Sequence, residues 1–353
     1  MIKFFRKIRQ RLLTQNQFSK YLIYAVGEIV LVVIGILIAL QINNWNTAKV
    51  QERQRQNFLT DLGEEIRKTQ QNDFNPFTIY SQYFLEMDSI LELIQENRLN
   101  EAEYRANEDL LLPMFSSKHT GILRENVNYL TLENGNNILK IRSEFPEKYE
   151  HLLYLLKAYQ DGFEIWKTQT QETFEEQKSF RSFMQNEYEW FYPLDSIDIS
   201  KAIDFSINNK NYRSRVEVYR RNFAYIIRAL SRVRNYQVFI MAEIERLSGG
   251  STADIKRVIE EFDFLPMETV SCDDNSTELK PAEFQFNIIY NSTKQPFKVH
   301  RLNSSYKPFE SFDIAPNQIM GFGQSVGMLF QVEMNGACYK RFKVIPDGYL
   351  LIE

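Results

Sequence analysis

Three patterns of apolar and polar residues follow one another along the chain. Residues 21–42 are apolar at nearly every position. From there to residue 265, apolar residues recur at intervals of three and four, which is typical of helices that bury one face. From residue 280 to 353, short alternating runs are separated by turn-forming residues, which is typical of strands. The patterns predict one apolar helix, then a helical region, then a small β-region.

The first stretch, residues 21–42, has the length and composition of a transmembrane helix. As a helix it rises about 33 Å, enough to cross the hydrocarbon core of a bilayer. Basic residues without a single acid precede it, whereas the far flank opens on three asparagines and a tryptophan. By the positive-inside rule, the N-terminus stays in the cytoplasm and the bulk of the chain lies in the periplasm. The basic residues are Lys3, Arg6, Lys7, Arg9, Arg11 and Lys20.

Both flanks of this stretch support a retained anchor at the bacterial inner membrane. Tyr21 and Tyr24 on one side and Trp45 on the other fit aromatic belts at the two interfaces. Residues 1–20 place apolar side chains on one helical face and bases around the other, as in helices that lie on anionic lipid. A basic flank without fixed structure is the alternative. A cleaved signal peptide fits less well, because the apolar run is too long and lacks a small-x-small cleavage pattern.

Glu28 is the one acidic or basic residue within the apolar stretch. On a helix it shares a face with Val32, Gly35 and Ala39, and the last two form a small-xxx-small pair that permits close helix contact. One interpretation is therefore a helix interface with a second copy of the chain or another membrane protein. In the other, Glu28 reaches the cytoplasmic headgroups and pairs with Lys20 or a neighbouring arginine. The sequence leaves both interpretations open.

The helical region is expected to form a stalk followed by an antiparallel bundle. Residues 43–76 continue with helix formers up to Pro76, and residues 77–265 contain three apolar stripes. A coiled coil between chains fits these stripes less well, because tyrosine and phenylalanine occupy many seam positions. Gly135 is expected to end a helix, and Ser251 with Asp254 to form a capping box. The stripes run from Phe77 to Ile94, from Tyr149 through Trp166 before fading at Thr170, and from Val216 to Leu247.

The last region, residues 280–353, is predicted to be a small antiparallel β-sandwich. The spacing of seven of its residues distantly resembles the β domain of the von Hippel-Lindau tumour suppressor. That resemblance implies a fold only, and no binding residue is carried across it. The seven residues are Phe286, Asn291, Val299, Pro316, Phe330, Val332 and Phe342.

The N-terminal sequence MIKFFRKIRQRLL, followed by KYLIYAVGEIVLVVIGILIALQINNWN, resembles the opening of a large family of uncharacterised bacterial membrane proteins. The resemblance is dense over residues 1 to about 46 and looser through residue 247. It implies a single-pass inner-membrane protein with a periplasmic helical domain, and it brings no established activity. Glu28, Asn43, Asn44 and Trp45 match this opening, so they are candidates for whatever the membrane segment does.

Composition restricts the chemistry further. A formal net charge of −4 argues against nucleic acid as a partner. The two cysteines, Cys272 and Cys338, fall on the periplasmic side, where a disulfide can persist; two buried thiols are the alternative. His119, His151 and His300 lie in no metal or nucleophile motif, so we expect no metal site, no cofactor and no catalytic centre. The carboxylates around residues 172–189 and the arginines between 213 and 234 fit solvated helix faces that pair with one another. The alternatives are acid-base work on glycans for the carboxylates, and a face that binds lipid headgroups or an anionic wall polymer for the arginines.

These observations predict a membrane-anchored, mainly α protein: one transmembrane helix that continues into a periplasmic helical bundle, plus a small C-terminal β-sandwich. The leading hypothesis is a non-enzymatic scaffold, sensor or assembly protein of the cell envelope. Its partners would be membrane lipid and, through the transmembrane helix, a second copy or another membrane protein. The alternative is a stator-like subunit in which Glu28 carries a proton or sodium ion. A glycan-active or peptide-active enzyme ranks last, because no site supports it.

Overall fold

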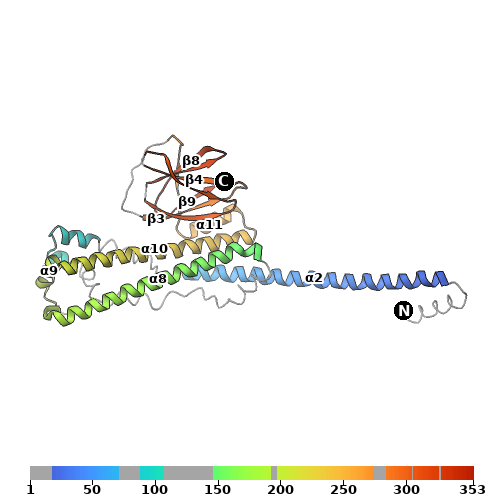
Figure 1. Ribbon diagram of the computed structural model, residues 1–353, viewed down its shortest axis with the longest axis horizontal. Helices are drawn as coiled ribbons and strands as arrows, with labels where there is room; N and C mark the ends of the chain where they lie inside the picture. Colours follow the sequence, from blue (N-terminus) through green and yellow to red (C-terminus); the bar gives the residue numbers. More distant parts are fainter. Residues whose placement is uncertain are drawn as a thin grey trace. The chain divides into compact units, whose positions relative to one another are not determined.

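The computed structural model describes residues 18–70, 88–106, 146–191, 197–273, 284–303, 305–325 and 327–353. The chain divides into two compact units, Met1–Thr60 and Asp61–Glu353. The described part is mostly helical, with one long apolar helix near the N-terminus and a β-rich C-terminal region, as the sequence predicts (Figure 1). Gly135 and residues 71–87 of the predicted stalk and first stripe lie outside the described residues.

Helix α2 (Phe18–Gln70) runs without interruption through both the apolar stretch and the polar stretch that follows it. Its last turn carries Arg67 and Lys68, which suits the negative end of the helix dipole. From Asp61 onward the helix belongs to the second unit, where Leu62 and Ile66 are buried. A Cβ at Gly63 would lie 3.7 Å from the Met241 side chain, so this end of α2 packs closely on α10.

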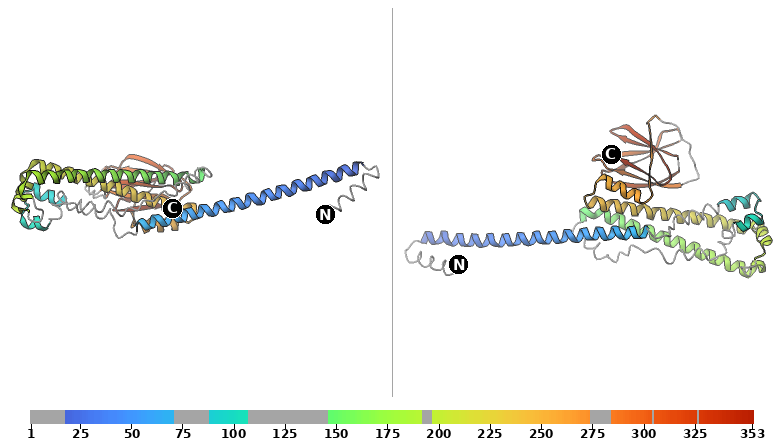
Figure 2. Two further views of the ribbon diagram at one scale, coloured as in Figure 1. Left: turned by 90° about the horizontal axis from the view of Figure 1, so that it is seen from below. Right: turned by 180° about the vertical axis from the view of Figure 1, so that it is seen from behind.

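The second unit is built on two long antiparallel helices, α8 (Pro146–Glu187) and α10 (Lys210–Leu247), which lie side by side in Figures 1 and 2. Shorter helices accompany them: residues 88–95, α4 (Glu101–Ala106), η3 (Glu189–Phe191), α9 (Ile199–Asn208) and α11 (Thr252–Glu261). Asp198 and Asn209 cap the starts of α9 and α10 with their side chains. The predicted capping box of Ser251 and Asp254 is confirmed at the start of α11.

Helix α8 continues well beyond Thr170, where its apolar stripe fades in the sequence. Thr170, Thr173 and Gln177 are buried on the same face as Phe180 and Met184. The Thr170 hydroxyl donates to the Trp166 carbonyl at 2.7 Å, and the Thr173 hydroxyl donates to the Gln169 carbonyl at 2.8 Å. Because these hydroxyls find partners in their own helix, the face can be buried without apolar residues.

The β-region contains two facing sheets. The four-stranded sheet has the order β1 (Leu265–Pro266), β9 (Gly348–Ile352), β3 (Phe284–Asn291), β6 (Ile319–Ser325). The five-stranded sheet has the order β2 (Glu268–Val270), β8 (Ala337–Lys343), β7 (Leu329–Met334), β4 (Phe297–Leu302), β5 (Pro308–Ile314). Strand β9 pairs parallel with both β1 and β3, so the first sheet is mixed and the expectation of a purely antiparallel sandwich was wrong. Strands β1 and β2 also precede residue 280.

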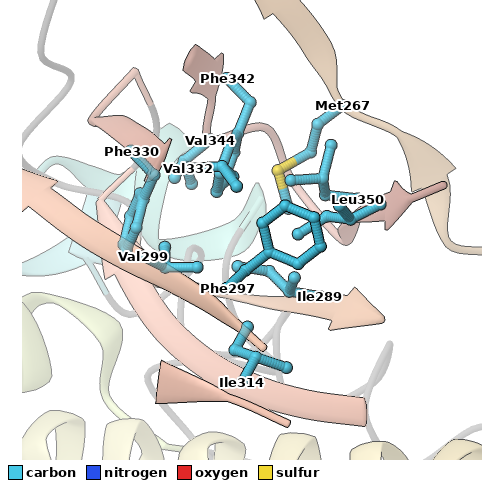
Figure 3. Close-up of a cluster of buried hydrophobic side chains, with 11 residues drawn as sticks. Met267, Ile289, Phe297, Val299, Ile314, Phe330, Val332, Phe342, Val344 and Leu350 are labelled. Atoms are coloured by element: carbon cyan, nitrogen blue, oxygen red, sulfur yellow. The ribbon is translucent and has the colours of Figure 1, made fainter. Parts of the chain in front are cut away.

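Buried side chains from both sheets meet in one core, shown in Figure 3. Ile289 and Leu350 come from the four-stranded sheet, and Val299, Phe330 and Phe342 from the five-stranded sheet. The rings of Phe330 and Phe342 stack with centroids 5.3 Å apart. A disulfide joins Cys272, just after β2, to Cys338 on β8, so the chain that leaves the edge strand β2 is covalently tied to the neighbouring strand.

Candidate functional site

The apolar stretch of α2 is the first candidate site. By length and composition α2 is able to cross a membrane: its best window has a mean hydropathy of 2.7, and none of that window is buried. Ile23 and Leu31 are each 73% exposed. A soluble core helix would instead bury such residues against the rest of the chain. Among the described residues, α2 is the one helix with these properties.

Glu28, Val32, Gly35 and Ala39 all lie in this stretch on exposed positions of α2. Their spacing of four, three and four residues places them on one face of the helix. A Cβ added at Gly35 would meet nothing within 4 Å, so the face is open at its small residues. The structure therefore groups the predicted interface residues on one open face.

The predicted interfacial anchors also lie on α2. Tyr24 is half-buried, and Trp45 is 66% exposed with the Lys49 ammonium 5.2 Å from its ring centroid. Tyr21 is part of the helix, but its side chain lies outside the described residues. A tryptophan with a neighbouring lysine, as at Trp45, is a common arrangement at the headgroup level of a membrane.

A second candidate site is the junction of α10 with the β-region, which centres on Arg234. Its guanidinium donates to the Phe262 carbonyl, and its Nη1 lies 3.1 Å from the Asp347 carboxylate. It also lies over the Phe264 ring, 4.7 Å from the centroid. One side chain of α10 thus holds both the end of α11 and the turn before β9. This role was missed from the sequence, because Arg234 and Asp347 are far apart in the chain.

Close packing reinforces this junction. A Cβ at Gly321 of β6 would lie 2.7 Å from Cζ of Phe239 on α10, so only glycine fits there without displacing the ring. The Tyr349 hydroxyl donates to Glu260 of α11 at 2.7 Å. Burial and this carboxylate raise the pKa of Tyr349 above its ordinary value. The helical region and the β-region therefore meet through packed contacts rather than through a linker.

The second unit also contains a buried carboxylate, Glu243 of α10, which is 3% exposed. Its two oxygens accept hydrogen bonds from Arg246 at 2.6 and 2.7 Å, and His151 Nδ1 lies 3.4 Å away. Burial by itself raises the pKa of Glu243, but the hydrogen bonds and charges of Arg246 and His151 outweigh burial and leave the pKa below its ordinary value. The cluster joins α8 to α10 and has the composition of a structural ion pair.

A second network that contains a histidine lies on the five-stranded sheet. His300 of β4 is 7% exposed, with Nδ1 2.6 Å from the Ser311 hydroxyl and Nε2 2.9 Å from Glu333. Sequence reasoning found no partner for His300, because strand register alone brings these three residues together. A serine, a histidine and a carboxylate are the groups of nucleophilic catalysis, but acyl transfer also needs preorganised donors for an oxyanion. The contacts themselves are those of cross-strand hydrogen bonds on neighbouring strands.

Metal chemistry finds no support in the described part of the chain, where no three histidine, cysteine or acidic side chains are grouped to hold an ion. His151 and His300 are accounted for by the contacts above, and His119 lies outside the described residues.

Comparison with known proteins adds one match. A family described as "Family of unknown function (DUF6090)" matches residues 28–111. The match covers less than half of the chain, and it includes Glu28, Val32, Gly35, Ala39 and Trp45 but not α8, α10 or the β-region. No curated protein and no solved structure matches the chain. The resemblance to the von Hippel-Lindau β domain therefore stays a prediction.

Proposed function

We propose that this protein is a non-enzymatic, membrane-anchored scaffold, sensor or assembly protein. In this proposal α2 spans the bacterial inner membrane once, residues 1–20 are cytoplasmic, and the second unit lies in the periplasm. The helical bundle and the β-region would be presented there to a partner. The observation that carries the proposal is the fully exposed apolar stretch of α2.

The free-energy cost of exposing apolar side chains to water supports a membrane-spanning α2. Leu22, Ile29, Leu31, Ile36 and Leu40 are each more than half exposed, and each such side chain gains about 1.5 to 3 kcal/mol on transfer out of water. Summed over the stretch, this cost is comparable to the total stability of a domain. Lipid removes the cost, and the basic residues before the stretch orient it.

The open face of α2 supports a partner within the membrane. Gly35 and Ala39 let a second helix approach closely, and Glu28 on the same face is able to form hydrogen bonds across such a contact. A second copy of the chain satisfies both requirements, because the same face is then present twice. We therefore expect assembly through this face.

The test compares two glycine substitutions in α2. Gly35→Leu fills the proposed interface, whereas Gly27→Leu makes the same change about 80° around the helix. A Cβ at either position would meet no atom within 4 Å apart from the neighbouring helix backbone, so both positions have room for the start of a side chain. Crosslinking in intact membranes followed by mass spectrometry should recover a homo-oligomer or a membrane partner from the parent and from Gly27→Leu, and much less from Gly35→Leu. Recovery of neither from the parent would overturn the proposal.

Two further measurements separate the remaining parts of the proposal. A phosphatase fused after Glu353 should be active only if the second unit is periplasmic, and a fluorescent reporter that matures in the cytosol should stay dark there. Glu28→Gln addresses the ion-carrying hypothesis, because glutamine keeps the hydrogen bonds but cannot carry a proton or balance a sodium ion. Under the scaffold proposal, Glu28→Gln should assemble as the parent does.

A further inference from the structure

A basic groove of about 770 Å³ lies between residues 88–95 and the first half of α10. Leu91 and Ile94 form its apolar wall, and Val218 and Ala224 contribute apolar surface from α10. The remaining α10 side chains along the groove are mostly cationic. They are Lys210, Arg213, Arg220, Arg221 and Arg228.

Basic side chains outnumber acidic ones among the described residues that line this groove. Glu217 is the single acid among them, and Gln95 donates a hydrogen bond to it at 3.4 Å. Asp88 forms an ion pair with Arg220. In the part of the chain that the structure describes, five basic side chains of the groove therefore accompany two carboxylates, on a chain whose overall net charge is −4. Such a local excess of positive charge attracts anions although the protein as a whole is acidic.

The cations recur at regular intervals along one stripe of α10. Arg213, Arg221 and Arg228 are seven or eight residues apart, which corresponds to about 10 to 12 Å along the helix axis. Ser214 and Ala224 lie between them, so the helix surface is open to close approach at these small side chains. A single small anion would need converging donors, whereas a row of separate cations fits a ligand that carries repeated negative groups.

The row continues into a second groove, of about 1050 Å³, between α8, α10 and β6. Arg228 lines both grooves, and Arg232 extends the row into the second. Tyr225 and Tyr236 also line the second groove. From Lys210 to Arg232 the row of cations spans about 33 Å of helix.

We propose that the two grooves together bind a linear polymer that carries phosphate groups along its chain. Arginine is the favoured cation for phosphate, because its planar guanidinium donates two parallel hydrogen bonds to the oxygens. Every basic residue of the row except Lys210 is an arginine. This site is independent of the membrane face of α2, so each can fail without the other.

The test measures binding of linear polyphosphate to the full chain in an uncharged detergent. The triple variant Arg213→Gln, Arg221→Gln and Arg228→Gln removes charge from the groove and leaves the Arg220–Asp88 ion pair in place. The matched control is Arg53→Gln, Arg257→Gln and Arg341→Gln, which removes the same charge from positions that line neither groove. The groove variant should bind about 100-fold more weakly, whereas the control should bind within about twofold of the parent.

The salt dependence of binding and competition by orthophosphate test whether the site recognises a chain of phosphates. The slope of log affinity against log salt should fall by about two to three in the groove variant, because three counterion-releasing contacts are lost. Orthophosphate at equal phosphate concentration should compete poorly, since it cannot reach several arginines at once. Equal loss in the two triple variants, or competition by orthophosphate as strong as by the polymer, would refute a linear site. A carboxylate polymer that binds more tightly than polyphosphate would refute the phosphate assignment.

A second variant tests the groove independently, in case the triple variant fails to fold. Ala224→Glu adds a carboxylate between Arg221 and Arg228 and removes no side chain contact of the row. It should also lower polyphosphate affinity, by about 10-fold, while the thermal unfolding midpoint stays near that of the parent. Unchanged affinity in a folded Ala224→Glu protein would count against the groove as the site.

Discussion

Helices α2 and α10 both carry many apolar side chains, but the two helices differ in whether these side chains are buried. Along α10, residues such as Val216, Phe223 and Ile226 recur on one face and are buried within the second unit. Along residues 22–42 of α2, apolar side chains point in every direction and are exposed. The apolar side chains of α10 are covered by the chain itself, whereas those of α2 are left uncovered, and our proposal is that a membrane covers them.

The largest expected effect is the loss of membrane association when charges are placed in the apolar stretch of α2. A double variant, Leu31→Arg with Ile34→Arg, puts two cations near the middle of the apolar stretch, at about 2.5 to 3.5 kcal/mol each on insertion scales. We expect most of this variant to lose membrane association in carbonate extraction. Gln51→Arg with Gln54→Arg adds the same charge to the polar part of α2 and should stay with the membrane. Full retention of the first variant would show that α2 is not the anchor.

The next largest effect is a loss of stability on truncating a buried phenylalanine of α8, compared with the same truncation at an exposed one. Phe180 is 4% exposed and Phe183 is 46% exposed. Phe180→Ala leaves a cavity and should lower the free energy of unfolding by about 3 to 5 kcal/mol. Phe183→Ala should cost about 1 kcal/mol or less. Urea unfolding in detergent, followed by the fluorescence of buried Trp166, measures both, and equal losses would contradict the assigned packing.

Local features of this chain could be predicted from the sequence, because neighbouring residues alone determine them. The apolar stretch of α2, the stripe of α10 and the capping box at Ser251 are of this kind. The burial of one face of α8 beyond Thr170 could not be predicted, because Thr170 and Thr173 are buried although their side chains are polar. A polar side chain that is satisfied within its own helix leaves no signal in an apolar pattern.

Features that depend on distant residues were not predictable. Strand β9 joins β3 in parallel, although alternation within each strand is the same for parallel and antiparallel pairing. His300, Ser311 and Glu333 meet only because β4 lies between β5 and β7. The groove along α10 was visible in the sequence as a run of arginines, but its walls were not. The face of Glu28, Val32, Gly35 and Ala39 was predictable as a face, and its partner remains a prediction.

A third prediction concerns the disulfide, which ties the β-region within the second unit. Cys272 and Cys338 are 66 residues apart, and closing such a loop stabilises the folded state by about 4 kcal/mol in the chain-entropy model. Cys272→Ser should therefore lower the midpoint of urea unfolding, and the reductant dithiothreitol should do the same to the parent. Reductant should have no effect on Cys272→Ser. If reductant shifted the urea midpoint equally in the parent and in Cys272→Ser, its effect would not come from reduction of this disulfide.

The smallest expected effect is a pH dependence of stability that comes from the buried ion pair of Glu243 with Arg246 on α10. Arg246 and His151 hold the pKa of Glu243 below its ordinary value of 4.5 although burial opposes them. A carboxyl whose folded-state pKa is depressed contributes stability at pH values above the unfolded-state pKa, and this contribution is lost as the pH falls through the folded-state pKa. The free energy of unfolding should therefore decline below about pH 4.5 by a Glu243-dependent amount.

Glu243→Gln isolates that amount, because glutamine cannot ionise. The stability difference between the parent and Glu243→Gln should shrink as the pH falls from 5 towards 3. Glu150→Gln, at an exposed position of α8, should show a much smaller change over the same range. A difference that grows on acidification would mean that Glu243 is protonated more readily in the folded chain than in the unfolded one. In that case burial would outweigh Arg246, and the α8–α10 pair would tolerate a neutral carboxyl at this buried position.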